Sequence, residues 1–227
     1  MKMLLIFLLL LLLLLGPQIW TSLLLRRYGK DRPDLRGNGG ELARHLVERL
    51  GLEGVVVEST AHGDHYDPDA RAVRLSEANY HGRSLTALAV AAHEVGHAIQ
   101  HHHREPLFFW RDRLVRIGAR VEQLGGYVML AVPLVALVTR HPAPAFVSFL
   151  FGLATLAAGA VVHFVTLPVE LDASFNKALP ILVKGGYVPA RDERAVRRVL
   201  RAAAYTYVAA SLMSLLNVWR WFAVLRR

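Results

Sequence analysis

The sequence predicts a mainly α-helical membrane protein whose transmembrane helices accompany a small α+β core. Four apolar segments, at residues 3–25, 124–139, 143–169 and 202–219, suggest helices of the kind that cross about 30 Å of hydrocarbon. The charged residues, 20% of the chain, are concentrated between these segments. Helical and strand-like patterns alternate between the first two apolar segments, which predicts the α+β core.

The apolar segments define the predicted organisation. Residues 3–25 carry no charge and are followed by no small-x-small cleavage site, so we expect an uncleaved anchor rather than a signal peptide. The next two segments are joined by Arg140-His141-Pro142, which is typical of a hairpin, although the short first arm with Pro133 also fits a buried soluble helix. The predicted parts are a transmembrane anchor at 1–25, a core at 26–123, a transmembrane hairpin at 124–167, a helical segment at 168–201 and a transmembrane or membrane-associated helix at 202–227.

Within the core, the apolar periodicity predicts a helix over 41–50 and another over 84–100. Short strands are predicted at 55–57 and 72–75, with a turn at 67–69. We expect the stretch 64–75 to form a sheet edge that can pair with an extended peptide.

The helix predicted over 84–100 carries the motif His93-Glu94-Val95-Gly96-His97. Residues four apart lie on one face of a helix, so both imidazoles can bind one metal ion. Glu94 adjoins the first histidine, where its carboxylate can act as a base on a metal-bound water. The motif therefore predicts a zinc hydrolase with His93 and His97 as ligands.

Two imidazoles and a water leave a zinc site one protein ligand short. His103 has the third-ligand spacing of the long metzincin motif, but Gln100 stands where that motif needs a glycine. Glu170 follows a long uncharged stretch and Pro168, and spacing alone leaves its role open between a ligand and a helix-start carboxylate. Asp172 is interpreted as a helix-start carboxylate or one that orients a ligand histidine.

Two further histidines could be metal ligands, but other roles are favoured. His65 is interpreted as a surface or hairpin-packing residue. His163 is interpreted as a polar residue that faces other helices within the third apolar segment.

Several spaced motifs extend this hypothesis to a family. Residues 64–68, 75–76, 82–84, 91–100, 167–170, 172–174 and 207–210, in this order, resemble the bacterial membrane-anchored neutral zinc metallopeptidases of the YugP type, in the gluzincin clan. The resemblance covers about residues 40–216 and implies a zincin-like (gluzincin) core with Zn²⁺ as cofactor. It also implies that Glu170 completes the metal site. In gluzincins a Tyr or His commonly stabilises the oxyanion, so Tyr207 is the candidate for this role.

The expected function is that of a zinc-dependent metalloendopeptidase that hydrolyses peptide bonds through an activated water, with Glu94 as general base. The expected partners are the lipid bilayer and peptide or protein substrates, with membrane-protein quality control as a suggested role. The alternatives are a non-catalytic membrane scaffold with a vestigial metal site and a metal transporter. A net charge of +9 is spread over loops and helix faces without a nucleic-acid-binding fold, so no nucleic-acid partner is expected.

The basic residues also predict sidedness. Of the 27 Lys and Arg, 15 lie between the first and second apolar segments and seven between the third and fourth. Because basic loops stay inside, the core and the segment around Glu170 are both expected in the cytoplasm of a multi-pass protein of the bacterial cell membrane. The absence of cysteine agrees with this compartment.

Overall fold

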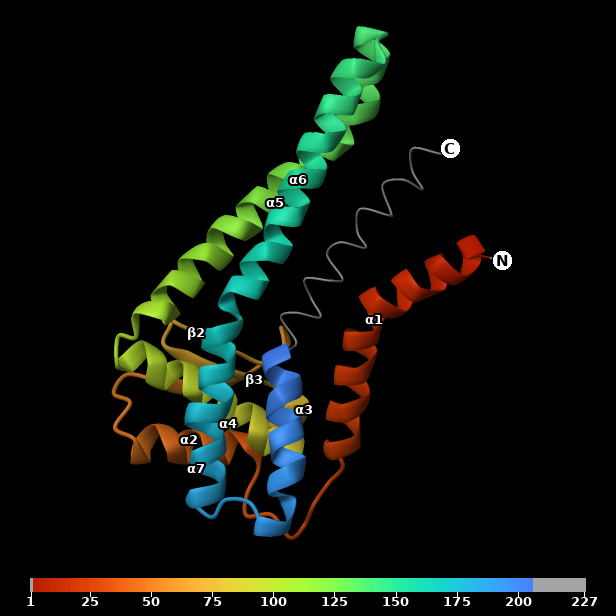
Figure 1. The fold of residues 1–227 in the computed structure, drawn as a ribbon. Helices are drawn as coiled ribbons and strands as arrows, with labels where there is room; N and C mark the ends of the chain where they lie inside the picture. Colours follow the sequence, from red (N-terminus) through yellow and green to blue (C-terminus); the bar gives the residue numbers. More distant parts are fainter. Residues whose placement is uncertain (1, 206–227) are drawn as a thin grey trace. The chain divides into compact units, whose positions relative to one another are not determined.

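The computed structural model describes residues 2–205, without the side chains of some residues in the apolar helices (Figure 1). These residues form two compact units. The first, called the mixed unit, comprises residues 19–109 and 168–205. The second, called the helical unit, comprises residues 2–18 and 110–167.

The mixed unit begins with the last part of helix α1 (Lys2–Tyr28), from residue 19 onward, followed by α2 (Gly39–Arg49). A capping box starts α2: the Asn38 side chain accepts a hydrogen bond from the Glu41 backbone N–H, and the Glu41 carboxylate accepts one from the Asn38 backbone N–H. A three-stranded sheet follows, made of β1 (Val56–Thr60), β2 (His65–Asp67) and β3 (Ala72–Ser76). Its order is β1-β3-β2, with β1 parallel and β2 antiparallel to β3.

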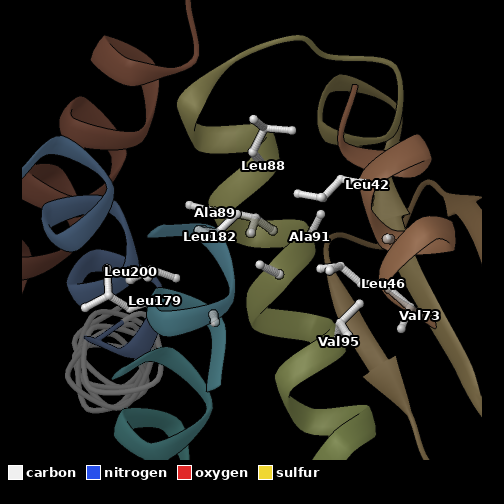
Figure 2. Close-up of a cluster of buried hydrophobic side chains, with 14 of the residues drawn as sticks. Leu42, Leu46, Val73, Leu88, Ala89, Ala91, Val95, Leu179, Leu182 and Leu200 are labelled. Carbon is white, nitrogen blue, oxygen red and sulfur yellow. The ribbon is translucent and has the colours of Figure 1, made fainter. Parts of the chain in front are cut away.

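Helix α4 (Leu85–His102), which follows the short α3 (Glu77–Tyr80), is the central element of the mixed unit. It is buried from Leu85 to Gln100 and contacts α2, β2, β3 and, later in the chain, the π-helix η1 (Asp172–Ala178) and α7 (Leu179–Lys184). A short 3₁₀ turn η2 (Ala190–Asp192) and a helical segment at 193–205 complete the unit. Figure 2 shows apolar residues on both sides of α4, with Leu42, Leu46 and Val73 on one side and Leu179, Leu182 and Leu200 on the other.

The helical unit contains most of two long helices, α5 (Pro106–Thr139) and α6 (Pro142–Leu171), joined by Arg140 and His141. Small residues bring the helices together: a Cβ atom on Gly125 would meet the Thr155 hydroxyl, and one on Gly152 would meet Met129. Among the described residues, α5 is the one helix long and apolar enough to cross a membrane by length and composition, with a mean hydropathy of 1.7 in its most apolar window. The first part of α6, Pro142–Thr155, is a shorter apolar helix.

The predicted fold class is confirmed in its coarse form, since the described chain is mostly helical with one small sheet. The predicted core helices and both predicted strands are present, but β2 was not predicted as a strand. The expected sheet edge at 64–75 is only partly right: β2 lies at an edge, whereas β3 is the central strand. The apolar stretch 124–139 is the second half of a helix that starts at Pro106. The five-part division stays a prediction, and residues 206–227 of its last part lie outside the described residues.

Candidate metal centre

Three buried side chains of the mixed unit converge on one point. His93 and His97 come from successive turns of α4, and Glu170 comes from the end of α6. One ligand atom from each residue lies within 4.8 Å of the others. The Glu170 Oε2 atom is 3.1 Å from His97 Nε2 and 3.4 Å from His93 Nε2.

The two distances from Glu170 Oε2 fit ligands of one tetrahedral ion. Ligand atoms about 2.0–2.1 Å from a tetrahedral zinc lie roughly 3.3 Å from one another. The donor set of two imidazoles and one carboxylate is also a set that catalytic zinc uses, with the fourth position left for water. Glu170 is 0% exposed, and a carboxylate buried this completely needs positive charge or hydrogen bonds close by. The residues present therefore fit a zinc ion.

Ser174 fixes the tautomer of His93. The Ser174 hydroxyl donates to the Leu200 carbonyl oxygen at 3.1 Å, so at its 2.9 Å contact with His93 Nδ1 it is the acceptor. The Nδ1 atom therefore carries the proton. The lone pair of a neutral imidazole is then on Nε2, the atom that faces Glu170.

Gln100 does the same for His97. Its side-chain N–H groups donate to the Val169 carbonyl oxygen at 3.0 Å and to Asp172 Oδ2 at 2.8 Å. Its amide oxygen, 2.9 Å from His97 Nδ1, is therefore the acceptor of a hydrogen bond from that atom. Again Nε2 is left with its lone pair toward the metal position, because the partner of the other ring nitrogen decides the tautomer.

Asp172 holds Gln100 in this orientation and is held in turn by two neighbours. Lys177 Nζ is 2.7 Å from Asp172 Oδ2 and 3.0 Å from Glu105 Oε1, and Asn176 donates to Asp172 Oδ1 at 2.7 Å. Burial raises the pKa of Asp172, but hydrogen bonds from Lys177, Gln100 and Asn176 outweigh it, so the pKa lies below its usual value. Asp172 is therefore ionised at neutral pH, and its contact with Gln100 connects it to His97. The sequence did not indicate Gln100 as the connecting residue.

The backbone of α4 and η1 explains how residues so distant in sequence meet. Ser84 caps α4 by accepting a hydrogen bond from the Ala87 N–H, which sets where the helix starts. Gly96, between the two histidines, lets η1 approach closely: a Cβ there would lie 2.8 Å from the Ala173 carbonyl oxygen. The π-helical turns of η1 follow Glu170 almost directly, a conformation that is frequent at functional sites.

The remaining candidates divide into three groups. Glu94 is buried on α4 next to His93. His103 is exposed at the end of α4 and His65 contacts the Gly63 carbonyl oxygen, and neither belongs to the metal-ligand group found among the described residues. Tyr207 and the side chain of His163 lie outside what the structure describes.

A family model described as "Putative neutral zinc metallopeptidase" matches residues 3–226. The chain belongs to this zinc metallopeptidase family. A relative from Bacillus subtilis (strain 168), named "Putative membrane protease YugP", is 34% identical over 231 residues, which cover 96% of each chain. No solved structure matches the chain. The family match thus confirms the predicted resemblance. The family description names zinc, and the His93, His97 and Glu170 group could hold such an ion.

Proposed function

We propose that this metallopeptidase-family protein is a zinc-dependent endopeptidase of the cell membrane that hydrolyses peptide bonds at the cytoplasmic face. The observation that carries the proposal is the pair of imidazoles whose Nδ1–H groups donate hydrogen bonds to Ser174 and Gln100. In the neutral imidazoles, the lone pairs of both Nε2 atoms then face the buried Glu170 carboxylate. Such an arrangement serves to hold a metal ion.

The chain supplies the acid–base chemistry through Glu94. Zinc held by His93, His97 and Glu170 would supply Lewis-acid activation of a water molecule and of the substrate carbonyl. Glu94, beside the first ligand, accepts a proton from the attacking water and delivers it to the leaving amine. Tyr207 is proposed to hold the oxyanion, by analogy with gluzincins. The unpaired side of edge strand β2, which contacts α4, is the proposed site for an extended substrate.

The membrane location is supported by the helical unit and by the relative. Both α5 and α6 expose large apolar side chains, including Leu134, Leu137, Phe146 and Val147, each more than half exposed. We propose that this pair, α1 and residues 202–227 associate with the bilayer, with the mixed unit on the cytoplasmic side where the basic residues lie. Membrane proteins are then accessible substrates, in agreement with a role in quality control.

The test separates metal binding from catalysis. Glu94→Gln should retain one zinc per chain and lose at least about a hundredfold in peptide cleavage, since the general base is gone. His97→Ala should lose both zinc and cleavage. The measurements are zinc content by mass spectrometry and hydrolysis of fluorogenic peptides by the purified full chain, before and after chelation and zinc restoration.

His103→Ala is the matched control, because His103 is an exposed histidine at the end of the same helix. It should keep zinc and activity. Full peptidase activity in zinc-loaded Glu94→Gln would remove the base from the proposal. Zinc binding without any cleavage by the wild-type chain would favour the non-catalytic scaffold.

A further inference from the structure

A second concave site lies in the mixed unit, beyond the last metal ligand of α4. The pocket has a volume of about 250 Å³ and lies between the end of α4, the sheet and the start of α5. It is lined by Ala98, His101 and His102, by Tyr66 of β2, by Glu53 and Val55, by Phe109, and by Arg71 and Arg104. The metal centre does not use these side chains.

Arg71 and Arg104 have an unusual backbone. Both are in the left-handed region, with φ of 50° and 54°, which costs every residue except glycine some free energy. Arg104 is the residue after the α4 cap in a Schellman motif, with hydrogen bonds from Arg104 N to the His101 oxygen and from Glu105 N to the Gln100 oxygen. Glycine is the usual residue at the position after the C-cap, so the backbone of Arg104 is strained where that of a glycine would not be.

Arg71 has the same left-handed backbone conformation in the turn between β2 and β3. Asp67 organises this turn by accepting hydrogen bonds from the Asp69 and Ala70 N–H groups. Thus two unrelated elements each place an arginine where glycine is favoured, and both arginines line one pocket. Backbone strain that recurs around one cavity is typical of a functional site.

The charge of the lining indicates the ligand. Arg71 and Arg104 are permanently cationic and their planar guanidinium groups suit carboxylates, while Glu53 is the one acidic lining residue. Within residues 2–205, neither Arg71 nor Arg104 forms an ion pair with an acidic side chain. The lining therefore favours an anionic group of small size.

The position of the pocket relates it to substrate binding. His101 is one turn beyond His97 on α4, which is about 6 Å along the helix axis, or roughly two residues of an extended chain. Phe108 links the two, with its ring 6.1 Å from that of His97 and stacked 5.5 Å from that of His101. The Tyr66 hydroxyl of edge strand β2 contacts His101 Nδ1 at 2.8 Å. A peptide paired with β2 and cleaved at the metal centre would place a nearby side chain at this pocket.

We propose that the pocket binds the carboxylate of an aspartate or glutamate side chain in the peptide substrate, through Arg71 and Arg104. The inference rests on the proposed peptidase function and names its substrate class, acidic peptides. Both arginines are specificity-determining residues, since each would contact the substrate at a distance from the reacting atoms.

The experiment compares matched fluorogenic peptides that differ by one glutamate or glutamine, with the substitution moved along the peptide. The zinc-loaded full chain should cleave the glutamate peptide at least about tenfold more efficiently at one position. Arg71→Gly and Arg104→Gly should each lower that ratio of kcat/KM about tenfold. Their melting temperatures should be equal to or above that of the wild type, because glycine relieves the strained backbone.

Arg140→Gly is the matched control, since Arg140 also has a positive φ of 51° but does not line the pocket. It should leave the preference unchanged. Cleavage of both peptides with equal efficiency at every position overturns the inference and leaves the proposed function intact. The inference is also overturned if both pocket variants melt at a lower temperature and the ratio of kcat/KM between the two peptides does not change. That result would assign the arginines a structural role.

Binding gives a readout that needs no turnover. Glu94→Gln should bind the glutamate peptide at least about tenfold more tightly than the glutamine peptide by fluorescence anisotropy, and Arg71→Gly in that background should abolish the difference. Equal affinities overturn the inference even where no peptide is cleaved, whereas absence of cleavage with unequal affinities contradicts only the proposed function.

Discussion

Ser174 and Gln100 each accept a hydrogen bond from the Nδ1–H group of one imidazole of the candidate metal centre, which leaves Nε2 of the neutral ring with the lone pair that a metal needs. Such partners of ligand histidines typically contribute 10–100-fold in metal affinity. Gln100→Leu and Ser174→Ala should therefore each weaken zinc binding by about 10–100-fold, as measured by competition with a chromogenic chelator. The loss should appear in the binding constant, independently of any peptide assay.

Asn176→Ala is the control for these two variants. Asn176 lies on the same π-helix and also contacts Asp172, but it is exposed and touches neither histidine. Its zinc affinity should stay within about threefold of the wild type. Unchanged affinity in both Gln100→Leu and Ser174→Ala would contradict the assignment of the tautomers.

Some residues of the candidate metal centre could be predicted from the sequence and others could not. His93, Glu94 and His97 share a helical spacing, and helix geometry alone places the two imidazoles together. Glu170 needed the family resemblance, because nothing in its own surroundings distinguishes a ligand from a helix-start carboxylate. Gln100 and Ser174 were not identified, since their roles depend on tertiary contacts with Asp172 and His93, which are 72 and 81 residues away.

The packing of α4 against η1 depends on one missing side chain. An alanine at Gly96 would gain about 1 kcal/mol of helix propensity, but its Cβ would lie 2.8 Å from the Ala173 carbonyl oxygen. Backbone cannot rotate away as a side chain can, so Gly96→Ala should cost about 1–3 kcal/mol in unfolding free energy. The shift of η1 should also displace Glu170 and weaken zinc binding.

Thermal melting and chelator competition on purified Gly96→Ala would measure both effects. Gly126→Ala is the matched control, since Gly126 is also helical and a Cβ there meets nothing within 4 Å. It should be neutral or slightly stabilising. A Gly96→Ala protein as stable as this control, with native zinc affinity, would show that the close approach is not required.

Elements with strong local signals were predictable. Helices α4 and α2 were predicted from their apolar periodicity, and the structure adds the caps at Ser84 and Asn38 that start them. Strand β2 falls within the stretch 64–75 that was expected to form a sheet edge, but its own bounds have no sequence signature, and pairing with β3 makes it a strand. The π-helix η1 has no sequence signature either. It arises where the chain packs against Gly96, so it belongs to the tertiary structure.

The whole molecule contains two kinds of surface. The mixed unit buries a single large core and carries most of the described charge, whereas α5 and α6 expose large apolar side chains along their length. Exposed apolar surface on this scale is unfavourable in water and is stable in a lipid environment. From the charge distribution we predict an orientation with the 15 basic residues between the first two apolar segments inside and the linker Arg140–His141 outside.

The chain contains no cysteine, so a single introduced thiol reports the orientation without background. His141→Cys lies in the exposed linker between α5 and α6, and Glu48→Cys lies on the exposed face of α2. In intact cells, a membrane-impermeant maleimide should label position 141 and spare position 48, and permeabilisation should expose both. Labelling of position 48 alone would reverse the orientation, and equal labelling of both in intact cells would mean that the hairpin does not cross the bilayer. Because His93, His97 and Glu170 must share one side to bind one ion, whichever side contains position 48 also contains the proposed peptidase site.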